Sequence, residues 1–206
     1  MSAVKVFLIF LLSIFLAEAS LAGFIPKAFE GDFEQIKKDR RGRDRTEPVK
    51  ILYSTPQSIK MTTETKGLKT ILVCNPEKTW IYNEGFGGEP GQVRVGDSAK
   101  YCYSQIFDVL ARGLTDNKFY KVKNLSKHEF KLTFSKNATS RLGYDEVDIK
   151  FKSKPHEFSQ IEHLVLINKD KSPVKLKLKK LQVVSKFDKE TFVFQIPKGA
   201  ETQQMN

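Results

Sequence analysis

The stretch Ile71-Leu-Val-Cys-Asn-Pro-Glu-Lys-Thr-Trp-Ile-Tyr-Asn83 decides the fold of this chain. It holds two short apolar runs, Ile71–Cys74 and Trp80–Tyr82, on either side of the turn-forming pair Asn75-Pro76. β-branched and aromatic residues favour strands, and an Asn-Pro pair marks a turn. The stretch therefore predicts two neighbouring strands joined by a short connection.

Alternation of apolar and polar residues extends this β pattern along the chain. A strand with such a pattern buries one apolar row and exposes the other row to water. Turn-forming residues at Gly42, Asn137 and Lys154-Pro155 separate the runs. We expect a mainly β protein with one curved antiparallel sheet that forms an incomplete barrel. The apolar rows are Phe130, Leu132 and Phe134; Val147, Ile149 and Phe151; Val174, Leu176 and Leu178; and Phe192, Phe194 and Ile196.

One segment breaks this alternation. Between residues 99 and 110 the apolar residues follow helical spacing, with Asp97 or Ser98 available as the N-cap and Gly113 as the stop. We predict a helix of about four turns that covers the apolar face of the sheet as a lid. The glycine-rich stretch Gly85–Gly96 predicts a mobile connection to this lid helix. The expected lid contacts are Ile106, Phe107 and Leu110.

The N-terminus has the build of a secretory signal peptide. An apolar run, Val6–Ala17, is followed by small residues that include Ala19 and Ala22 as cleavage points. This run is too short to span a bilayer core of roughly 30 Å. We therefore expect residues 1–22 to be the signal peptide and residues 23–206 to be one exported domain.

The chain is basic, with a formal net charge of +11. Lysines that alternate with apolar residues are typical of a solvated sheet face, and a polyanion site is the alternative. Export and the absence of a nucleic-acid-binding motif argue against a nucleic-acid partner. Residues 37–45 hold six basic and two acidic residues around Gly42, which predicts a hairpin tip. This tip is either a solvated turn or a docking patch for an anionic partner, formed by Arg40, Arg41, Arg43 and Arg45.

Cys74 and Cys102 are the two cysteines of the chain. In an oxidising compartment they could pair, although sequence alone does not give their separation. We predict a disulfide that joins a strand to the lid helix. The histidines show no metal-ligand spacing, and no nucleophile elbow or phosphate-binding glycine loop is present. We expect no metal, no cofactor and no enzymatic activity.

The aromatic content leaves two alternatives for the interior. The chain has 16 Phe, 6 Tyr and 1 Trp, and a single predicted helix to cover the apolar sheet face. Such a chain forms either an ordinary packed core or a half-barrel around a hydrophobic cavity. The residues predicted to line the cavity are Ile59, Met61, Ile71, Val73, Trp80, Tyr82, Phe130, Leu132, Phe134, Val147, Ile149 and Phe151. On this basis Ile59→Glu would weaken binding of an apolar ligand more than it weakens folding.

The segment from Ile71 to Asn83 resembles the strand–turn–strand of the LolA family of periplasmic lipoprotein carriers. Residues 28–35 and 52–61 are similar to the first two strands of that family, and residues 192–199 to its closing strand. These matches follow the order and spacing of the family. The resemblance implies a curved antiparallel sheet, closed by helices around a hydrophobic cavity.

The same resemblance implies a function. Members of the family hold the acyl chains of lipoproteins released by an inner-membrane ABC transporter, cross the periplasm and deliver them to an outer-membrane receptor lipoprotein. Gly23, where a lipoprotein would carry cysteine, favours a soluble carrier. We expect this carrier to be a monomer. Two departures from the family stand out: Thr55 replaces an arginine that latches the lid, and the first helix must be short or missing.

Two other functions remain as alternatives. A lipid-sensing regulator of envelope stress could use the same fold, because fold does not fix function. A hydrolase of lipid or glycan would need a buried catalytic group, and the sequence nominates none.

Overall fold

The computed structural model describes residues 24–39, 41–102 and 104–205. The signal peptide predicted for residues 1–22 lies outside these ranges. Among the described residues, no helix is long and apolar enough to cross a membrane.

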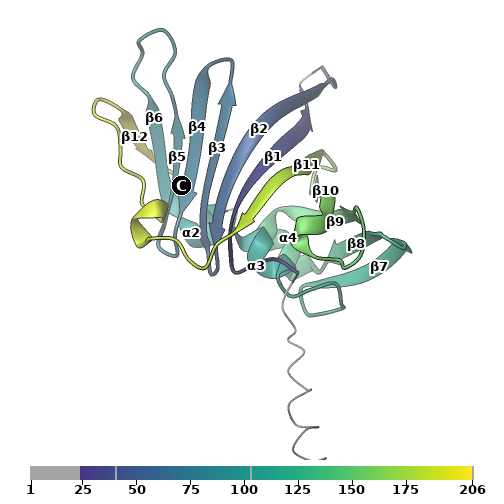
Figure 1. Ribbon diagram of the computed structural model, residues 1–206. Helices are drawn as coiled ribbons and strands as arrows, with labels where there is room; N and C mark the ends of the chain where they lie inside the picture. Colours follow the sequence, from purple (N-terminus) through teal and green to yellow (C-terminus); the bar gives the residue numbers. More distant parts are fainter. Residues whose placement is uncertain (1–23, 40, 103, 206) are drawn as a thin grey trace, which may run out of the picture.

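The described residues form one twelve-stranded, strongly curved sheet that does not close into a barrel (Figure 1). The predicted mainly β fold is therefore confirmed. The strand order is β12-β6-β5-β4-β3-β2-β1-β11-β10-β9-β8-β7. The strands are β1 (Ala28–Lys38), β2 (Asp44–Ser54), β3 (Ser58–Thr65), β4 (Leu68–Cys74), β5 (Lys78–Asn83), β6 (Gln92–Asp97), β7 (Tyr120–Ser126), β8 (Glu129–Phe134), β9 (Tyr144–Phe151), β10 (Ile161–Asn168), β11 (Pro173–Val183) and β12 (Glu201–Gln204).

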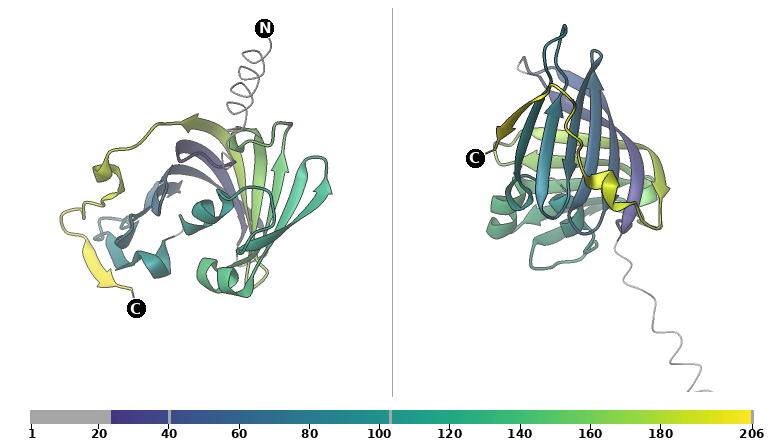
Figure 2. Two further views of the ribbon diagram at one scale, coloured as in Figure 1. Left: turned by 90° about the horizontal axis from the view of Figure 1, so that it is seen from below. Right: turned by 90° about the vertical axis from the view of Figure 1, so that its left-hand side faces the viewer.

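Two antiparallel meanders make up the sheet. Strands β1 to β6 follow one another in space as in sequence, and so do β7 to β11. The meanders join where β1 pairs with β11. Seen from below, the sheet curves around the short helices that the chain places between the two meanders (Figure 2, left). The short helices therefore lie on the concave face of the sheet.

The prediction of one continuous four-turn helix is wrong, because the segment forms two short helices. The chain forms α2 (Ser98–Tyr101), capped as predicted by Asp97, and then α3 (Gln105–Leu110), with an extended residue at Cys102 between them. The Gln105 side-chain amide donates to the backbone carbonyls of Ser98 and Ala99 at 3.1 and 3.2 Å. A side chain of α3 thus provides hydrogen bonds to carbonyl groups of α2. The remaining short helices are α4 (Lys136–Leu142), η1 (Phe158–Gln160) and η2 (Lys189–Phe192).

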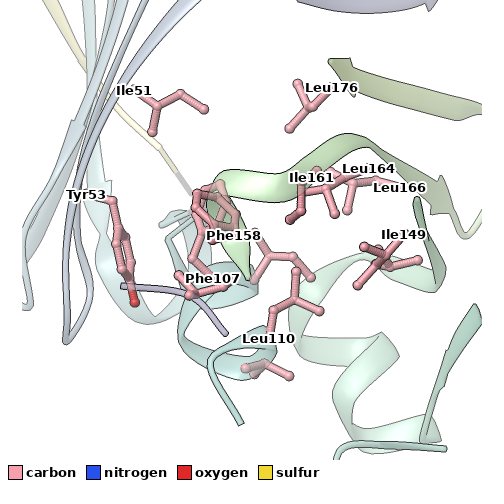
Figure 3. Close-up of a cluster of buried hydrophobic side chains, with 14 of the residues drawn as sticks. Ile51, Tyr53, Phe107, Leu110, Ile149, Phe158, Ile161, Leu164, Leu166 and Leu176 are labelled. Atoms are coloured by element: carbon pink, nitrogen blue, oxygen red, sulfur yellow. The ribbon is translucent and has the colours of Figure 1, made fainter. Parts of the chain in front are cut away.

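An aromatic cluster joins α3 to the sheet. The rings of Phe29 and Tyr53, on β1 and β2, lie with their centroids 5.7 and 5.4 Å from that of Phe107 on α3. Phe158 of η1 packs against Phe29 at 4.8 Å. Figure 3 shows Phe107 and Phe158 below Ile51 and the opposing β11 strand. Burial of each aromatic ring is worth about 2–3 kcal/mol, so this cluster fixes α3 in place.

The strand predicted at residues 192–196 does not form. Phe192 ends η2, and the chain then crosses the outer face of the sheet before β12 pairs in parallel with β6 (Figure 2, right). Phe192 is buried, the Phe194 ring packs against Tyr82 at 5.6 Å, and Asn75 Nδ2 donates to the Phe192 carbonyl. The alternation at 192–196 thus reflects packing onto a sheet face and not pairing within the sheet.

The N-terminal side agrees with the expected absence of a long first helix. From residue 24 onward, the chain enters β1 at Ala28 with no helix before it. The Gly85–Gly96 stretch is not a connection to the lid, because β6 begins inside it at Gln92. Gly85, Gly87, Gly88 and Gly91 instead lie in the connection between β5 and β6, where Phe86 is exposed, and Gly96 lies within β6.

Candidate functional site

A cavity of about 840 Å³ opens on the concave face of the sheet. Strands β1 to β4 form one wall, β10 and β11 form the other, and α3 contributes Ile106 and Phe107. Its volume falls within the roughly 300–1,000 Å³ of small-molecule sites. The lining residues are Gln35, Lys37, Arg45, Glu47, Ile51, Met61, Thr63, Thr65, Lys66, Leu68, Thr70, Leu72, Ile106, Phe107, Tyr144, Leu166, Asn168, Val174 and Leu176.

The cavity is apolar in its depth and polar at its mouth. The residues near α3, such as Ile51, Leu72 and Leu176, are buried aliphatic side chains. Toward the strand ends that lie away from the helices, the lining changes to threonines and charged groups. An apolar chain fits this depth without any polar partner, while a polar end of the same molecule fits the mouth.

Four residues predicted to line the cavity lie on the wrong face. In β4 the inner row is Leu68, Thr70 and Leu72, which places the intervening residues on the outer face. Pairing of β4 with β5 carries this outward row across the sheet. The C-terminal segment described above covers it. The prediction is thus wrong for Ile71, Val73, Trp80 and Tyr82.

Other predicted lining residues lie on the inner face but away from the cavity. Phe130, for example, packs with Phe151 at 5.8 Å between centroids. These side chains fill a solid core beneath the helices, and Ile59 and Leu110 are likewise fully buried outside the cavity. Met61, Ile106 and Phe107 are the predicted residues that do line it. The core residues are Phe130, Leu132, Phe134, Val147, Ile149 and Phe151.

The placement of Ile59 corrects an expected experiment. Its side chain has no exposed surface, and it does not line the cavity. A charge there would be buried without a partner and would cost several kcal/mol of folding free energy. Ile59→Glu therefore does not separate binding from folding, whereas a change at the half-buried Met61 does.

Asp108 ties α3 to the sheet. Its carboxylate accepts hydrogen bonds from the Tyr53 hydroxyl at 2.7 Å, the Thr55 hydroxyl at 3.2 Å and the Gln57 backbone N–H at 3.1 Å. Burial, and then the adjacent Asp108 charge, raise the pKa of Tyr53 well above its usual range, so the phenol stays protonated and donates. Thr55, which replaces the latching arginine expected from the resemblance, therefore contacts α3 through a hydrogen bond from its uncharged hydroxyl to the Asp108 carboxylate.

A disulfide forms a second tie between the helices and the sheet. Cys74 ends β4 and Cys102 lies between α2 and α3; their sulfurs are 2.03 Å apart and their Cα atoms 5.8 Å apart. Both cysteines are buried. The break in the predicted helix thus coincides with the residue that is bonded to the strand.

The mouth of the cavity holds a buried carboxylate. Glu47 is 6% exposed and contacts Lys37 Nζ at 2.9 Å and Arg45 Nε at 2.6 Å. Burial alone would raise the pKa of Glu47, but hydrogen bonds from Lys37 and Thr65 and the charges of Lys37 and Arg45 outweigh it and lower the pKa. The residues predicted for the site did not include Glu47. Its position in β2 could have indicated it, because Glu47 alternates in phase with the inward residues Val49 and Ile51.

The four arginines of the predicted docking patch do not form one surface. Arg40 lies outside the described residues. Arg43 pairs with Asp39 at 2.9 Å, and Arg45 turns into the cavity mouth toward Glu47. Arg41 is exposed at the tip of the β1–β2 hairpin, which does form as predicted. The basic run is therefore divided between a hairpin tip and the cavity.

Within the described part of the chain, no group of three or more His, Cys, Asp or Glu side chains is arranged to hold a metal ion. The lining places polar groups at the mouth of the cavity and aliphatic side chains behind them.

A curved, open antiparallel sheet with short helices on its concave face and an apolar cavity between them defines the LolA-like class of binding proteins. The family model described as "Outer membrane lipoprotein carrier protein LolA" matches residues 26–195. The chain belongs to the LolA family. The description of the family model names the family as one of outer-membrane lipoprotein carrier proteins.

Solved structures resemble this chain at low sequence identity. An uncharacterized conserved protein from Thermus thermophilus has 9% identity and a TM-score of 0.48, covering 88% of this chain and 93% of that one. A LolA superfamily protein from Nitrosomonas europaea has 8% identity and a TM-score of 0.47, covering 84% and 94%. MucB has 12% identity and a TM-score of 0.37, covering 92% and 64%. No curated protein sequence matched the chain.

Proposed function

We propose that the protein is a carrier that binds acyl chains in the cavity without chemical change. The apolar depth of the cavity, in a chain of the LolA family, is the observation that supports this function. Each acyl methylene removed from water contributes about 0.8 kcal/mol, so an acylated molecule crosses an aqueous compartment only when its chains are covered. In this proposal the cavity between β1–β4 and β10–β11 provides such a cover.

The proposed setting is the periplasm, after removal of residues 1–22, with residues 23–206 as the carrier domain. The cargo would be acylated lipoproteins received from an inner-membrane lipoprotein-releasing ABC transporter and passed to an outer-membrane receptor lipoprotein. Membership of the LolA family and the cavity support this proposal. We propose a monomer as the working form.

A regulatory function is the second candidate. MucB-type binding proteins share the superfamily fold, and lipid binding in the cavity would serve a sensor as well as a carrier. The two differ in what happens to the bound lipid: a carrier releases it to an acceptor, whereas a sensor changes its affinity for a partner protein.

Met61→Glu tests the cavity as the binding site. Met61 is half-buried on β3 and lines the cavity, so an acyl chain would desolvate the new carboxylate. We expect at least a tenfold loss of affinity for a fluorescent fatty-acid probe, because an unpaired charge costs more than about 1.4 kcal/mol on desolvation. Titration of the probe into both proteins measures the change.

The control for this experiment is Thr62→Glu. Thr62 follows Met61 on the same strand but faces the outer side of the sheet, where it pairs with Ile71. It introduces the same charge and is expected to leave the affinity for the probe unchanged. Equal binding by wild type and Met61→Glu would show that acyl chains do not occupy this cavity.

The tip of the β1–β2 hairpin is the remaining candidate for docking to an anionic membrane. Arg41 and Arg43 lie there, close to Lys37 and Arg45, which line the cavity. We expect Arg41→Ser with Arg43→Ser to weaken association with anionic vesicles by up to about 1 kcal/mol per residue, more at low salt than at high salt, and to leave affinity for the probe in solution unchanged.

The matched control also removes two positive charges, but at the end of the molecule opposite the hairpin tip. Lys152 and Lys154 are exposed residues beyond the end of β9, near η1. Lys152→Ser with Lys154→Ser is expected to have a smaller effect on vesicle association. If the two double variants behave alike in a vesicle flotation assay, the basic tip is a solvated turn.

A further inference from the structure

We propose that the cavity selects amphiphiles with an anionic headgroup, whose carboxylate or phosphate is held by Lys37 and Arg45 at the mouth. This proposal rests on the proposed function, since it assumes that the acyl chain occupies the cavity. It goes further in naming the chemistry of the polar end.

Lys37 and Arg45 occupy directly opposite positions in the sheet. They are cross-strand partners on β1 and β2, and both side chains line the cavity. Two like charges in such a pair destabilise a sheet unless something compensates them. On the inner face of this sheet, the arrangement concentrates positive charge at one point of the cavity mouth.

Glu47 compensates this pair only in part. Its carboxylate contacts Lys37 Nζ at 2.9 Å and Arg45 Nε at 2.6 Å, so the group of three keeps a net charge of +1. Lys66, in the β3–β4 turn, adds another cation to the lining, and Glu47 is the one acidic residue among the described residues that line the cavity. The mouth therefore attracts anions.

The geometry also leaves donors for a ligand. Arg45 contacts Glu47 through Nε, and a guanidinium carries four further N–H donors on its terminal nitrogens, while the Lys37 ammonium has three in all. Both side chains are nearly half exposed, at 41% and 46%, whereas that of Glu47 is 7% exposed. A buried carboxylate thus holds two accessible cations in position, which lowers the cost of ordering them around an anion.

The apolar wall begins directly beside these cations. On the neighbouring strand β11, Val174 is the partner of Lys37, and Leu176 is the partner of Gln35, the next inward residue of β1. The Leu176 side chain points toward the depth of the cavity (Figure 3). A ligand with its charged group at Lys37 and Arg45 therefore has its chain directed along Leu176 toward Ile51 and Phe107. A neutral diacylglyceryl group would use the apolar part alone.

Three probes with the same acyl chain separate the contribution of the headgroup from that of the chain: laurate, lauroyl-lysophosphatidylglycerol and the neutral monolaurin. We expect the protein to bind the better anionic probe about five- to tenfold more tightly than monolaurin at low salt, because only the anionic probes accept charge-assisted hydrogen bonds from the half-exposed Lys37 and Arg45. The preference should decrease with added salt. Comparison of laurate with the lysophospholipid distinguishes a carboxylate from a phosphate headgroup.

Two variants assign the preference to the proposed residues. Lys37→Gln with Arg45→Gln removes the cations but leaves Glu47 buried without them, so the second variant adds Glu47→Gln to relieve this charge. We expect each variant that folds to lose the anionic preference and to keep its affinity for monolaurin. The control is Lys50→Gln with Lys179→Gln, which removes two cations paired with Glu30 and Glu34 elsewhere on the sheet and should keep the preference.

The outcomes are distinct. Equal affinity of the wild type for laurate, the lysophospholipid and monolaurin would overturn this proposal and leave the proposed function intact. A preference that persists in the triple variant would also overturn it. If no probe binds the wild type, the proposed function fails, and this proposal fails with it.

Discussion

Asp108→Ala is expected to lower the free energy of unfolding by about 2–3 kcal/mol. The carboxylate accepts three hydrogen bonds, including one of 2.7 Å from Tyr53, whose side chain has no exposed surface. Removing the acceptor leaves a buried hydroxyl without a partner, which costs more than the bond itself contributes. Urea denaturation followed by tryptophan fluorescence measures the change.

The control for this variant is Asp44→Ala. Asp44 pairs with Lys38 at 2.7 Å, but both side chains are more than half exposed, and such ion pairs contribute less than about 1 kcal/mol. A double-mutant cycle with Tyr53→Phe isolates the contact: once the hydroxyl is absent, loss of Asp108 should cost less. If Asp108→Ala is no more destabilising than Asp44→Ala, the helix is not latched through this residue.

Replacement of Cys74 and Cys102 by alanine is expected to cost about 3 kcal/mol of stability. The disulfide closes a loop between residues 28 positions apart, and its loss restores the conformational entropy of that loop to the unfolded chain. The same bond joins β4 to the junction of α2 and α3. We therefore also expect weaker acyl binding, because α3 supplies Ile106 and Phe107 to the cavity.

Reductant provides the internal control. Added to the wild type during denaturation, it should lower the urea midpoint toward that of the double alanine variant, and it should not change the midpoint of that variant. Because both cysteines are buried, the reduction must be allowed to reach completion in denaturant before refolding. An unchanged wild-type midpoint after full reduction would contradict a stabilising disulfide.

Alternation predicted most of the sheet because period two is a direct consequence of strand geometry. It failed at Ile71–Cys74, where residues of both parities are apolar, so no rule of alternation selects the inner row. In such a run both faces are buried, and here the second cover is the C-terminal segment around Phe192 and Phe194. That cover depends on contacts between residues more than 100 positions apart, which a local pattern does not contain.

The site was less predictable than the fold for a related reason. Aromatic rows such as that of Phe130 were expected to line the cavity, but large rings fill space well and form the solid core instead. The cavity is lined by aliphatic and threonine residues farther along the strands, such as Met61, Thr63 and Leu166. Helical spacing at 99–110 predicted Ile106, Phe107 and Leu110 as lid contacts, of which the first two line the cavity and Leu110 does not. The spacing did not reveal the break at Cys102.

The ladder between β1 and β11 has a consequence for the order in which the molecule is assembled. It pairs Phe29 with Val183, residues separated by most of the chain, and it is the ladder that joins the two meanders. During synthesis each meander pairs through neighbouring hairpins as it emerges, but this seam waits until β11 has been made. The cavity has walls on both sides of the seam, so it is complete only after β11 has paired with β1.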